Sequence, residues 1–331
     1  MATPSDRIFD SKMGEAEALA ARHSTSMIHN VMNRGEWGIL LALALIWGAA
    51  FFFIKVAVTH VDPLTYVWLR LTIAAAALWL LLRYRGDRLN LPREVWGAIL
   101  VLALLNNMIP FVLFGWGQRH IASGLASILN ATTPIWGVIV AHLATRDERI
   151  TPAKVLGVVI GFAGVATMIG PGLLSNGGGL VPQLACLAAA FCYAVAGVWA
   201  RRFKRLGVTP IKVAAGQLLA GAAVMSPIAL IVDQPWLRPF PPIEAWGAIA
   251  ALALVCTAFA YILYFKLIES AGATNALLVT LLVPPTAILL GGLLLGERLT
   301  GAQFMGLGFI ALGLAVIDGR LFAAFRKKTF A

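Results

Sequence analysis

The sequence predicts an all-α integral membrane protein with ten transmembrane helices, arranged as two inverted five-helix repeats. Three observations predict it: an apolar composition, ten apolar segments of membrane-spanning length, and a motif that occurs once in each half. Of the 331 residues, 60% are hydrophobic and only 12% are charged, with a mean hydropathy of +0.84. A soluble domain carries roughly 25% charged residues, so a water-soluble fold could not hide this much apolar surface.

The apolar residues come in segments long enough to cross a bilayer. A hydrocarbon core of ~30 Å takes about 20 helical residues. The segments lack the alternating polar pattern of barrel strands, and a helix satisfies its own backbone hydrogen bonds in lipid. The predicted spans are residues 37–57, 63–82, 95–115, 121–143, 153–172, 180–200, 211–232, 245–265, 274–295 and 302–317, of which the last is short.

The Lys and Arg residues orient these spans, because positive residues in short loops stay on the cytoplasmic side. With the N-terminus inside, the cytoplasmic connectors and tails hold 21 of the 26, and the opposite side holds only Arg119, Arg238 and Arg298. This bias predicts that both termini are cytoplasmic and accounts for the net charge of +11. It also removes support for nucleic-acid binding, which would gather basic residues on a folded domain.

The segments outside the spans add no further domain. Residues 1–36 are expected to form a solvated cytoplasmic tail, without the apolar core of a secretory signal, and Met27 or Met32 could replace Met1 as the start. Residues 320–331 are expected to form a second cytoplasmic tail. The three Cys lie in apolar spans and the five His are scattered without ligand spacing. We therefore expect no disulfide, no metal site and no cofactor.

A short motif occurs once in each half. Glu-Arg-Ile-Thr at 148–151 follows the fourth span, and Glu-Arg-Leu-Thr at 297–300 follows the ninth. Residues 63–70 of the second span likewise match residues 210–217 of the seventh. Two glycines follow each motif at the same spacing: Gly157 and Gly164, then Gly306 and Gly313. We therefore predict two related units, residues 37–172 and 180–319.

Because each unit has five spans, an odd number, the two copies must insert with opposite orientations. Inverted repeats recur in secondary transporters, where the substrate site lies near the membrane midplane between the halves. This is the main argument from the sequence for transport.

Together these motifs resemble the EamA-type branch of the drug/metabolite transporter superfamily. The resemblance rests on Trp-Gly-Ala-Ala-Phe at 47–51 with Lys55, on residues 63–70, and on the paired Glu-Arg-Ile/Leu-Thr motifs. It implies a ten-helix bundle of the bacterial inner membrane that exports amino acids, related metabolites or toxic compounds. One departure is Thr-Arg-Asp before Glu148, where the family more often has an apolar residue and Gly.

Polar side chains near the midplane are candidates for the substrate site, because in hydrocarbon they are costly unless they face a cavity or a partner helix. Asn and Gln could bind the amino and carboxylate groups of a zwitterion, and aromatic rings could form an apolar wall. The alternative is hydrogen bonding between helices, worth about 0.6 kcal/mol per contact. The candidates are Trp47, Asn106, Asn107, Asn130, Thr132, Thr133, Tyr193, Gln217, Thr257, Tyr261 and Thr280.

Two cations, Lys55 and Arg70, lie inside predicted spans at similar depth. They could face one vestibule and attract a carboxylate or phosphate, which Arg can bind with two parallel hydrogen bonds. The alternative is snorkelling to the outer interface or a tie to a helix-end carbonyl. We favour the alternative for Lys55 and the cavity role for Arg70. Glu148 and Glu297, each beside an Arg at a helix end, are expected to pair or cap between spans.

Three prolines are candidate hinges. Pro134, Pro284 and Pro285 are predicted to interrupt the fourth and ninth spans at corresponding places, and such breaks point to binding sites or hinges in transporters. The paired glycines are expected to allow close helix contact. No Asp or Glu lies inside a predicted span, so a carboxylate proton relay has no obvious carrier.

We expect a secondary transporter that exports amino acids or related metabolites, with membrane lipids and a small-molecule substrate as its partners. The runner-up is an exchanger of organic anions or nucleotide sugars, favoured by Lys55 and Arg70. A third hypothesis, a membrane scaffold or receptor, predicts an interior packed without a cavity. The sequence shows no catalytic residues, no phosphate-binding loop and no nucleophile motif, which argues against an enzyme.

Overall fold

The computed structural model describes residues 32–144, 151–174, 179–271, 276 and 278–318, and no strand occurs among them. Eight helical segments are long and apolar enough to cross a membrane, and two shorter apolar helices, Leu282–Leu295 and Gly301–Ile317, follow. They occur in the order of the ten predicted spans. The prediction of an all-α fold is therefore confirmed for the described residues.

The helices extend beyond the predicted spans at several ends. Two of the spans contain a π-helical turn, η1 and η3, and one is divided into two helices, α6 and α7. In chain order the helices are α2 (Arg34–His60), α3 (Pro63–Tyr84), α4 (Arg93–Ala103), η1 (Leu104–Met108), α5 (Ile109–Gln118), α6 (Ser123–Asn130), α7 (Thr133–Ala144), α8 (Pro152–Leu174), α9 (Leu180–Arg205), α10 (Pro210–Val232), the 3₁₀ turn η2 (Pro235–Leu237), α11 (Ile243–Ala253), η3 (Leu254–Phe259), α12 (Ala260–Ala271), α14 (Val279–Leu295) and α15 (Gly301–Asp318).

Local sequence fixes several helix ends. Asn33 caps α2 by accepting from the Glu36 backbone N–H at 2.9 Å, and the Glu36 carboxylate accepts from the Asn33 N–H at 2.8 Å. Pro63 and Pro210 open α3 and α10, where a missing N–H costs nothing because the first helical N–H groups have no partner. Gly296, with a left-handed φ of 66°, ends α14, a conformation that favours glycine.

The third and eighth spans share a feature that the sequence analysis did not predict. Each is a continuous helix with a π-helical turn near its middle, α4–η1–α5 and α11–η3–α12. The two turns begin at Leu104 and Leu254, each eight residues after the tryptophan of a Trp-Gly-Ala-Ile sequence. π-Turns inside α-helices are frequent at functional sites, and these two occupy equivalent places in the two halves.

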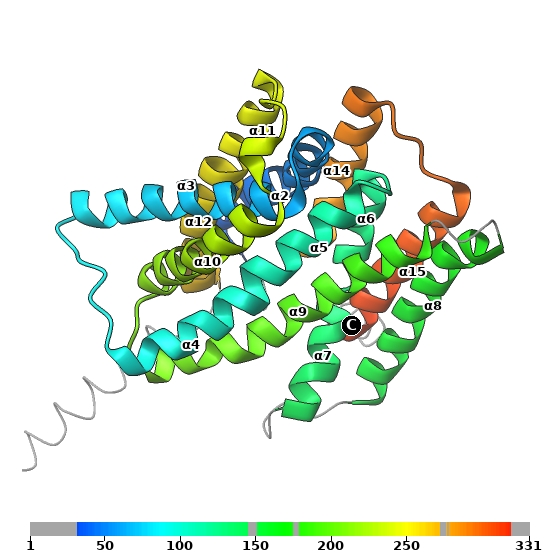
Figure 1. Ribbon diagram of the computed structural model, residues 1–331. Coiled ribbons are helices and arrows are strands. Elements are labelled where there is room, and N and C mark those ends of the chain that lie inside the picture. Colours follow the sequence, from blue (N-terminus) through cyan, green and yellow to red (C-terminus); the bar gives the residue numbers. More distant parts are fainter. Residues whose placement is uncertain (1–31, 145–150, 175–178, 272–275, 277, 319–331) are drawn as a thin grey trace, which may run out of the picture.

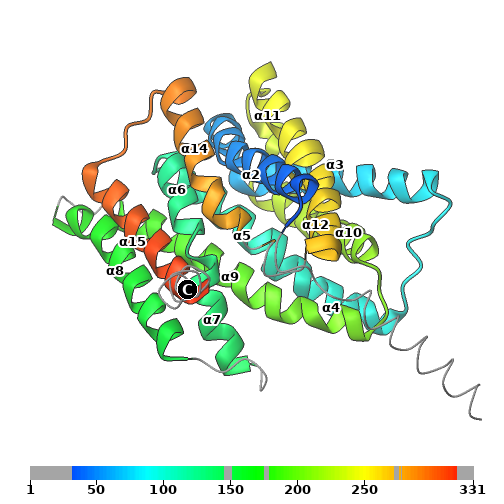
Figure 2. The ribbon, with the colours of Figure 1, turned by 180° about the vertical axis from the view of Figure 1, so that it is seen from behind.

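The helices form a bundle with a helix pair at either end. In both views α8 and α15 lie side by side at one end, while α3 and α10 pack together at the other (Figures 1 and 2). Between them, α2 packs against α14, and α5 packs against α9. One buried apolar cluster is centred on α3, α10 and α11, and a second lies among α5, α6, α9 and α14.

The predicted packing role of the paired glycines is confirmed at α8 and α15. A Cβ on Gly157 would lie 2.5 Å from the carbonyl oxygen of Gly313, and one on Gly164 would lie 2.7 Å from that of Gly306. The early glycine of each helix therefore meets the late glycine of the other, so the two helices run antiparallel. Only glycine allows their backbones to approach this closely.

The predicted proline breaks occur in only one of the two spans. α6 ends at Asn130 and α7 begins at Thr133, with Pro134 in its first turn. In the ninth span the prediction is wrong, because α14 continues through Pro284 and Pro285. Gly48 of α2 leaves room there for the α14 backbone, since a Cβ on Gly48 would lie 2.8 Å from the Val283 carbonyl oxygen.

Candidate functional site

Polar side chains from α3, η1, α10, η3 and α12 meet inside the bundle. We call them the Arg70 cluster. Four of them are less than one-tenth exposed and lie on helices that are otherwise apolar. Because polar groups within a membrane are costly unless they have partners or a function, this cluster is the candidate site. Its members are Arg70, Asn106, Asn107, Gln217, Thr257 and Tyr261.

Arg70 is 5% exposed and has neutral partners. Its Nε donates to the Thr257 hydroxyl at 2.9 Å, and that hydroxyl donates to the Leu252 carbonyl oxygen at 2.7 Å. The guanidinium carbon lies 3.7 Å from the centroid of the Phe111 ring, a cation–π contact. Among the residues that the structure describes, no carboxylate lies within ion-pair distance of Arg70.

The amide groups of the cluster form a chain. Asn106 Nδ2 donates to Gln217 Oε1 at 3.1 Å and to the Tyr261 hydroxyl at 3.3 Å. The Tyr261 hydroxyl in turn donates to Asn107 Oδ1 at 2.9 Å. Asn107 is completely buried, and its Nδ2 donor has no acceptor within the described part of the chain. The cluster therefore contains one unpaired charge and one unused N–H donor group.

The contacts follow the internal repeat. Arg70 and Gln217 occupy matching positions on α3 and α10. Arg70 of the first half bonds to Thr257 in the π-turn of the second half, and Gln217 of the second half bonds to Asn106 in the π-turn of the first. Each half thus contributes a membrane-embedded polar residue that reaches the π-turn of the other.

The remaining candidate residues lie outside this chain of hydrogen bonds. Tyr193 stacks on Phe114 with ring centroids 6.1 Å apart and packs against the buried apolar cluster that includes Phe111. Trp47 packs on Tyr264 at 5.3 Å, and Thr280 is partly buried in α14.

Three candidates lie at the break between α6 and α7. The Thr132 and Thr133 hydroxyls donate to the carbonyl oxygens of Leu129 and Asn130, at 2.6 and 2.7 Å. The side-chain oxygen of Asn130 is buried without a donor among the described residues. These contacts stabilise the break between the two helices and do not extend to the Arg70 cluster.

Two residues that touch Arg70 were not among the predicted candidates. Phe111 provides the ring beneath the guanidinium, and the Tyr66 hydroxyl faces Arg70 while donating to the Phe111 carbonyl oxygen. Helical spacing could have found both. Tyr66 precedes Arg70 by four residues and Phe111 follows Asn107 by four, so each shares a helix face with its partner.

Lys55 and Glu297 hold the connection between the third and fourth spans. Lys55 Nζ donates to the carbonyl oxygens of Gln118 and Ile121, which is the predicted tie to a helix end. Glu297 accepts from the Ser123 N–H at 2.8 Å and the Ser123 hydroxyl at 2.7 Å, and so caps α6 as predicted. The corresponding residue Glu148 lies outside the described residues.

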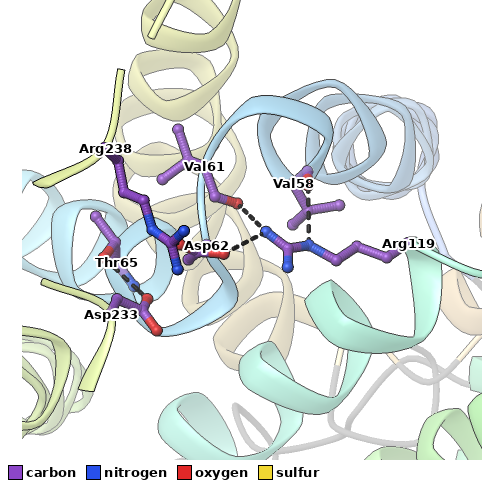
Figure 3. Close-up of polar contacts among 7 residues, drawn as sticks. All are labelled: Val58, Val61, Asp62, Thr65, Arg119, Asp233 and Arg238. Atoms are coloured by element: carbon purple, nitrogen blue, oxygen red, sulfur yellow. Dashed lines mark hydrogen bonds and ion pairs between the residues drawn. The ribbon is translucent and has the colours of Figure 1, made fainter. Parts of the chain in front are cut away.

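A second polar group surrounds the turn between α2 and α3 (Figure 3). Asp62 forms ion pairs with Arg119 at 2.8 Å and with Arg238 at 3.1 Å. Arg119 also donates to the carbonyl oxygens of Val58 and Val61, both at 3.0 Å. Asp62 and the two arginines border a cleft of about 640 Å³, whose other walls include Trp68, Trp236, Phe240 and Trp246. Arg119 and Arg238 are two of the three arginines predicted for the side of the membrane opposite the cytoplasm, and both bind the Asp62 carboxylate.

The sequence profile of the EamA-like transporter family matches residues 36–170 and again residues 181–318. The chain belongs to the EamA-like transporter family. The resemblance to this branch of the drug/metabolite transporter superfamily is thereby confirmed. The protein is a multi-pass membrane transporter and not an enzyme.

Relatives in the family agree with this assignment. The chain is 25% identical to the uncharacterized transporter YoaV of Bacillus subtilis, over 77% of this chain and 86% of that protein. It is 27% identical to the uncharacterized inner membrane transporter YedA of Escherichia coli K12, over 77% and 81%. A crystal structure that shares 23% identity covers 86% of this chain and 97% of its own, with a TM-score of 0.60. Because the two sequences are only 23% identical, this match shows a shared fold and no more.

Proposed function

We propose that this EamA-like protein is a secondary transporter that exports small metabolites, amino acids or related compounds, across the inner membrane by alternating access. The observation that carries the proposal is the Arg70 cluster. It is polar, it lies within the apolar bundle, and both halves contribute to it. A site between two repeats near the membrane midplane is where such transporters bind substrate.

The proposed architecture is a ten-helix bundle of two five-helix repeats with opposite orientations and both termini in the cytoplasm. Two successive profile matches support a duplication. The glycine contacts support the opposite orientation, because exchanging Gly157 with Gly306 and Gly164 with Gly313 converts one contact between α8 and α15 into the other. Antiparallel helices related in this way are exchanged by a two-fold axis perpendicular to them, which would lie in the membrane plane.

Amino acids and related compounds fit the chemistry of the cluster. Asn106, Asn107 and Gln217 offer both donors and acceptors, which suit a zwitterion, and Tyr193 and Tyr261 provide aromatic surface beside them. The name of YedA supports a location in the inner membrane. One observation favours the second candidate, an exchanger of organic anions: Arg70 has no carboxylate partner among the described residues.

The test is transport by purified protein reconstituted in liposomes, offered a labelled neutral amino acid, an organic anion and a cationic dye. Gln217→Ala removes a contact between the halves, whereas the control Gln303→Ala removes a cap within the first turn of α15. We expect uptake of the amino acid or the anion, reduced by Gln217→Ala and unchanged by Gln303→Ala. Equal rates in both variants would place the substrate elsewhere, and no uptake of any compound would contradict the proposal for these substrates.

Pro284 and Pro285 remain proposed hinges, although α14 continues through them. Each lacks an N–H, so the helix loses two backbone hydrogen bonds and can bend there at lower cost. Pro134 would serve the equivalent role at the start of α7. Replacing Pro284 and Pro285 with Ala should reduce transport more than membrane insertion. Normal expression together with unchanged uptake kinetics would refute the hinge.

A further inference from the structure

We propose that Arg70 and Asn107 form a binding site for a carboxylate group of the substrate. That the bound ligand is also the transported molecule rests on the proposed function. The site itself can be measured as binding in the absence of transport. Two independent observations in the structure support it: a buried cation without an anion, and a buried donor without an acceptor.

The first observation is the charge of Arg70. An arginine is protonated at any physiological pH, and burial of an ion without a partner of opposite charge costs several kcal/mol. The side chain of Arg119 is 34% exposed and still has Asp62 and two carbonyl oxygens around it. Arg70 is far more buried, yet its contacts are the hydroxyls of Thr257 and Tyr66 and an aromatic ring, none of which carries a negative charge. The missing negative charge is one that a ligand can supply.

The second observation is the free amide of Asn107. Its oxygen accepts from Tyr261, which fixes the side chain, while Nδ2 lacks an acceptor among the described residues. Phe111, one helical turn after Asn107, carries the Arg70 guanidinium over its ring. Tyr261 also lies within electrostatic range of Arg70. Guanidinium and amide donors in one cluster require a ligand that only accepts hydrogen bonds, as a carboxylate does.

Charge balance selects the ligand class. The single positive charge of the Arg70 guanidinium matches the single negative charge of a carboxylate. A phosphate group carries nearly two negative charges, so its binding would leave uncompensated negative charge buried. The Phe111 ring lies beneath the Arg70 guanidinium, and Phe114 and Tyr193 stack on each other, so the ligand should carry an apolar or aromatic body. Because Arg70 is buried in this structure, the carboxylate must enter in a state in which the halves have moved apart.

Binding to the purified full-length protein in detergent tests the site. Benzoate is the probe, and benzamide and phenyl phosphate are matched probes with the same ring and a neutral or a more highly charged head. The variant is Arg70→Gln, because Gln217 at the equivalent position of the other half shows that glutamine is accommodated beside a π-turn. The control is Arg238→Gln at the outer surface.

We expect saturable binding of benzoate, weakened at least about tenfold by Arg70→Gln because a charge-assisted hydrogen bond is lost, and unchanged by Arg238→Gln. Asn107→Leu should weaken benzoate binding without creating affinity for benzamide. Benzoate binding that survives Arg70→Gln, equal binding of benzamide or phenyl phosphate, or no binding at millimolar concentration would overturn the proposal.

The failure of this site and the failure of the transport proposal give different results. Amino-acid or anion uptake in liposomes without Arg70-dependent benzoate binding would refute the carboxylate site and leave transport standing. Arg70-dependent benzoate binding without uptake of any carboxylate would leave the site standing and refute transport.

Discussion

Arg119 and Arg70 are both held by side chains from distant parts of the chain, yet their surroundings differ. Arg119 lies at the turn between α2 and α3, partly exposed, with a carboxylate and two carbonyl oxygens as acceptors (Figure 3). Arg70 lies inside the bundle, almost fully buried, with two hydroxyls and an aromatic ring as its partners and no carboxylate among the described residues. The more exposed arginine therefore has the more complete set of partners.

The difference indicates which arginine serves the structure and which serves a ligand. When a guanidinium has acceptors for its N–H groups, it holds in place the chain segments that supply these acceptors. Arg119 in this way connects the end of α5 to the turn before α3. A guanidinium that lacks an anion in a low-dielectric interior keeps its attraction for one. Substitutions at Arg119 should therefore affect stability, and substitutions at Arg70 should affect substrate recognition.

The largest effect on stability is expected for Arg119→Gln. The change removes the ion pair with Asp62 and bonds to two carbonyl oxygens, and should lower the free energy of unfolding by about 2 kcal/mol. Thermal unfolding in detergent measures it, with Arg298→Gln as the control at an exposed arginine. Equal unfolding midpoints for the two variants would remove the structural role assigned to Arg119.

Lys55→Met is expected to have the next largest effect. The lysine is engaged by the carbonyl oxygens of Gln118 and Ile121, and its loss should cost about 1 kcal/mol of stability. Carboxylate transport per folded molecule should not change, because the ammonium group has its acceptors within the protein. A loss of carboxylate transport at normal stability would instead place Lys55 beside Arg70 in the substrate path.

A smaller effect is expected for Thr257→Val, which keeps the shape of the side chain and removes the hydroxyl bonded to Arg70. The guanidinium becomes less well positioned, so we expect benzoate affinity to fall by about threefold, which corresponds to roughly 0.6 kcal/mol. The matched control is Thr167→Val, whose hydroxyl bonds only to a carbonyl oxygen of its own helix. Identical benzoate affinities in the two variants would show that Thr257 does not position Arg70.

The smallest effect is expected for the exposed ion pair between Asp87 and Lys212, at 2.8 Å. The hydrogen bond from Lys212 holds the pKa of Asp87 below its ordinary value. The pair therefore contributes stability above the ordinary pKa, and this contribution is lost as the pH falls through the lower pKa of the folded state. Asp87→Asn should leave the thermal midpoint unchanged at neutral pH, since solvent screens such pairs. A decrease as large as that of Arg119→Gln would contradict this ranking.

The sequence predicted the order of the helices well because hydropathy acts locally. The apolar segments, the prolines that open α3 and α10, and the break before Pro134 all depend on residues close together in the chain. The close packing of α14 on Gly48 of α2 depends instead on residues far apart in the chain. No pattern within the ninth span contains that information.

The candidate site shows the same limit. Depth within the spans selected Arg70, Asn106, Asn107, Gln217, Thr257 and Tyr261, and the structure brings these six together. Their pairing could not be derived, because Arg70 and Thr257 are 187 residues apart. The π-turns that carry Asn106 and Thr257 were also missed, since the choice between α and π hydrogen bonding depends on contacts between helices.

The most direct test of the different roles of Arg70 and Arg119 is uptake into liposomes of a labelled carboxylate that the wild-type protein carries, normalised to folded protein. Wild type, Arg70→Gln and Arg119→Gln are compared. We expect Arg70→Gln to lose uptake while its unfolding midpoint stays near that of wild type. Arg119→Gln should keep its uptake per folded molecule while its midpoint falls. Uptake preserved in Arg70→Gln, together with a large fall in its midpoint, would contradict the account and make Arg70 a structural residue.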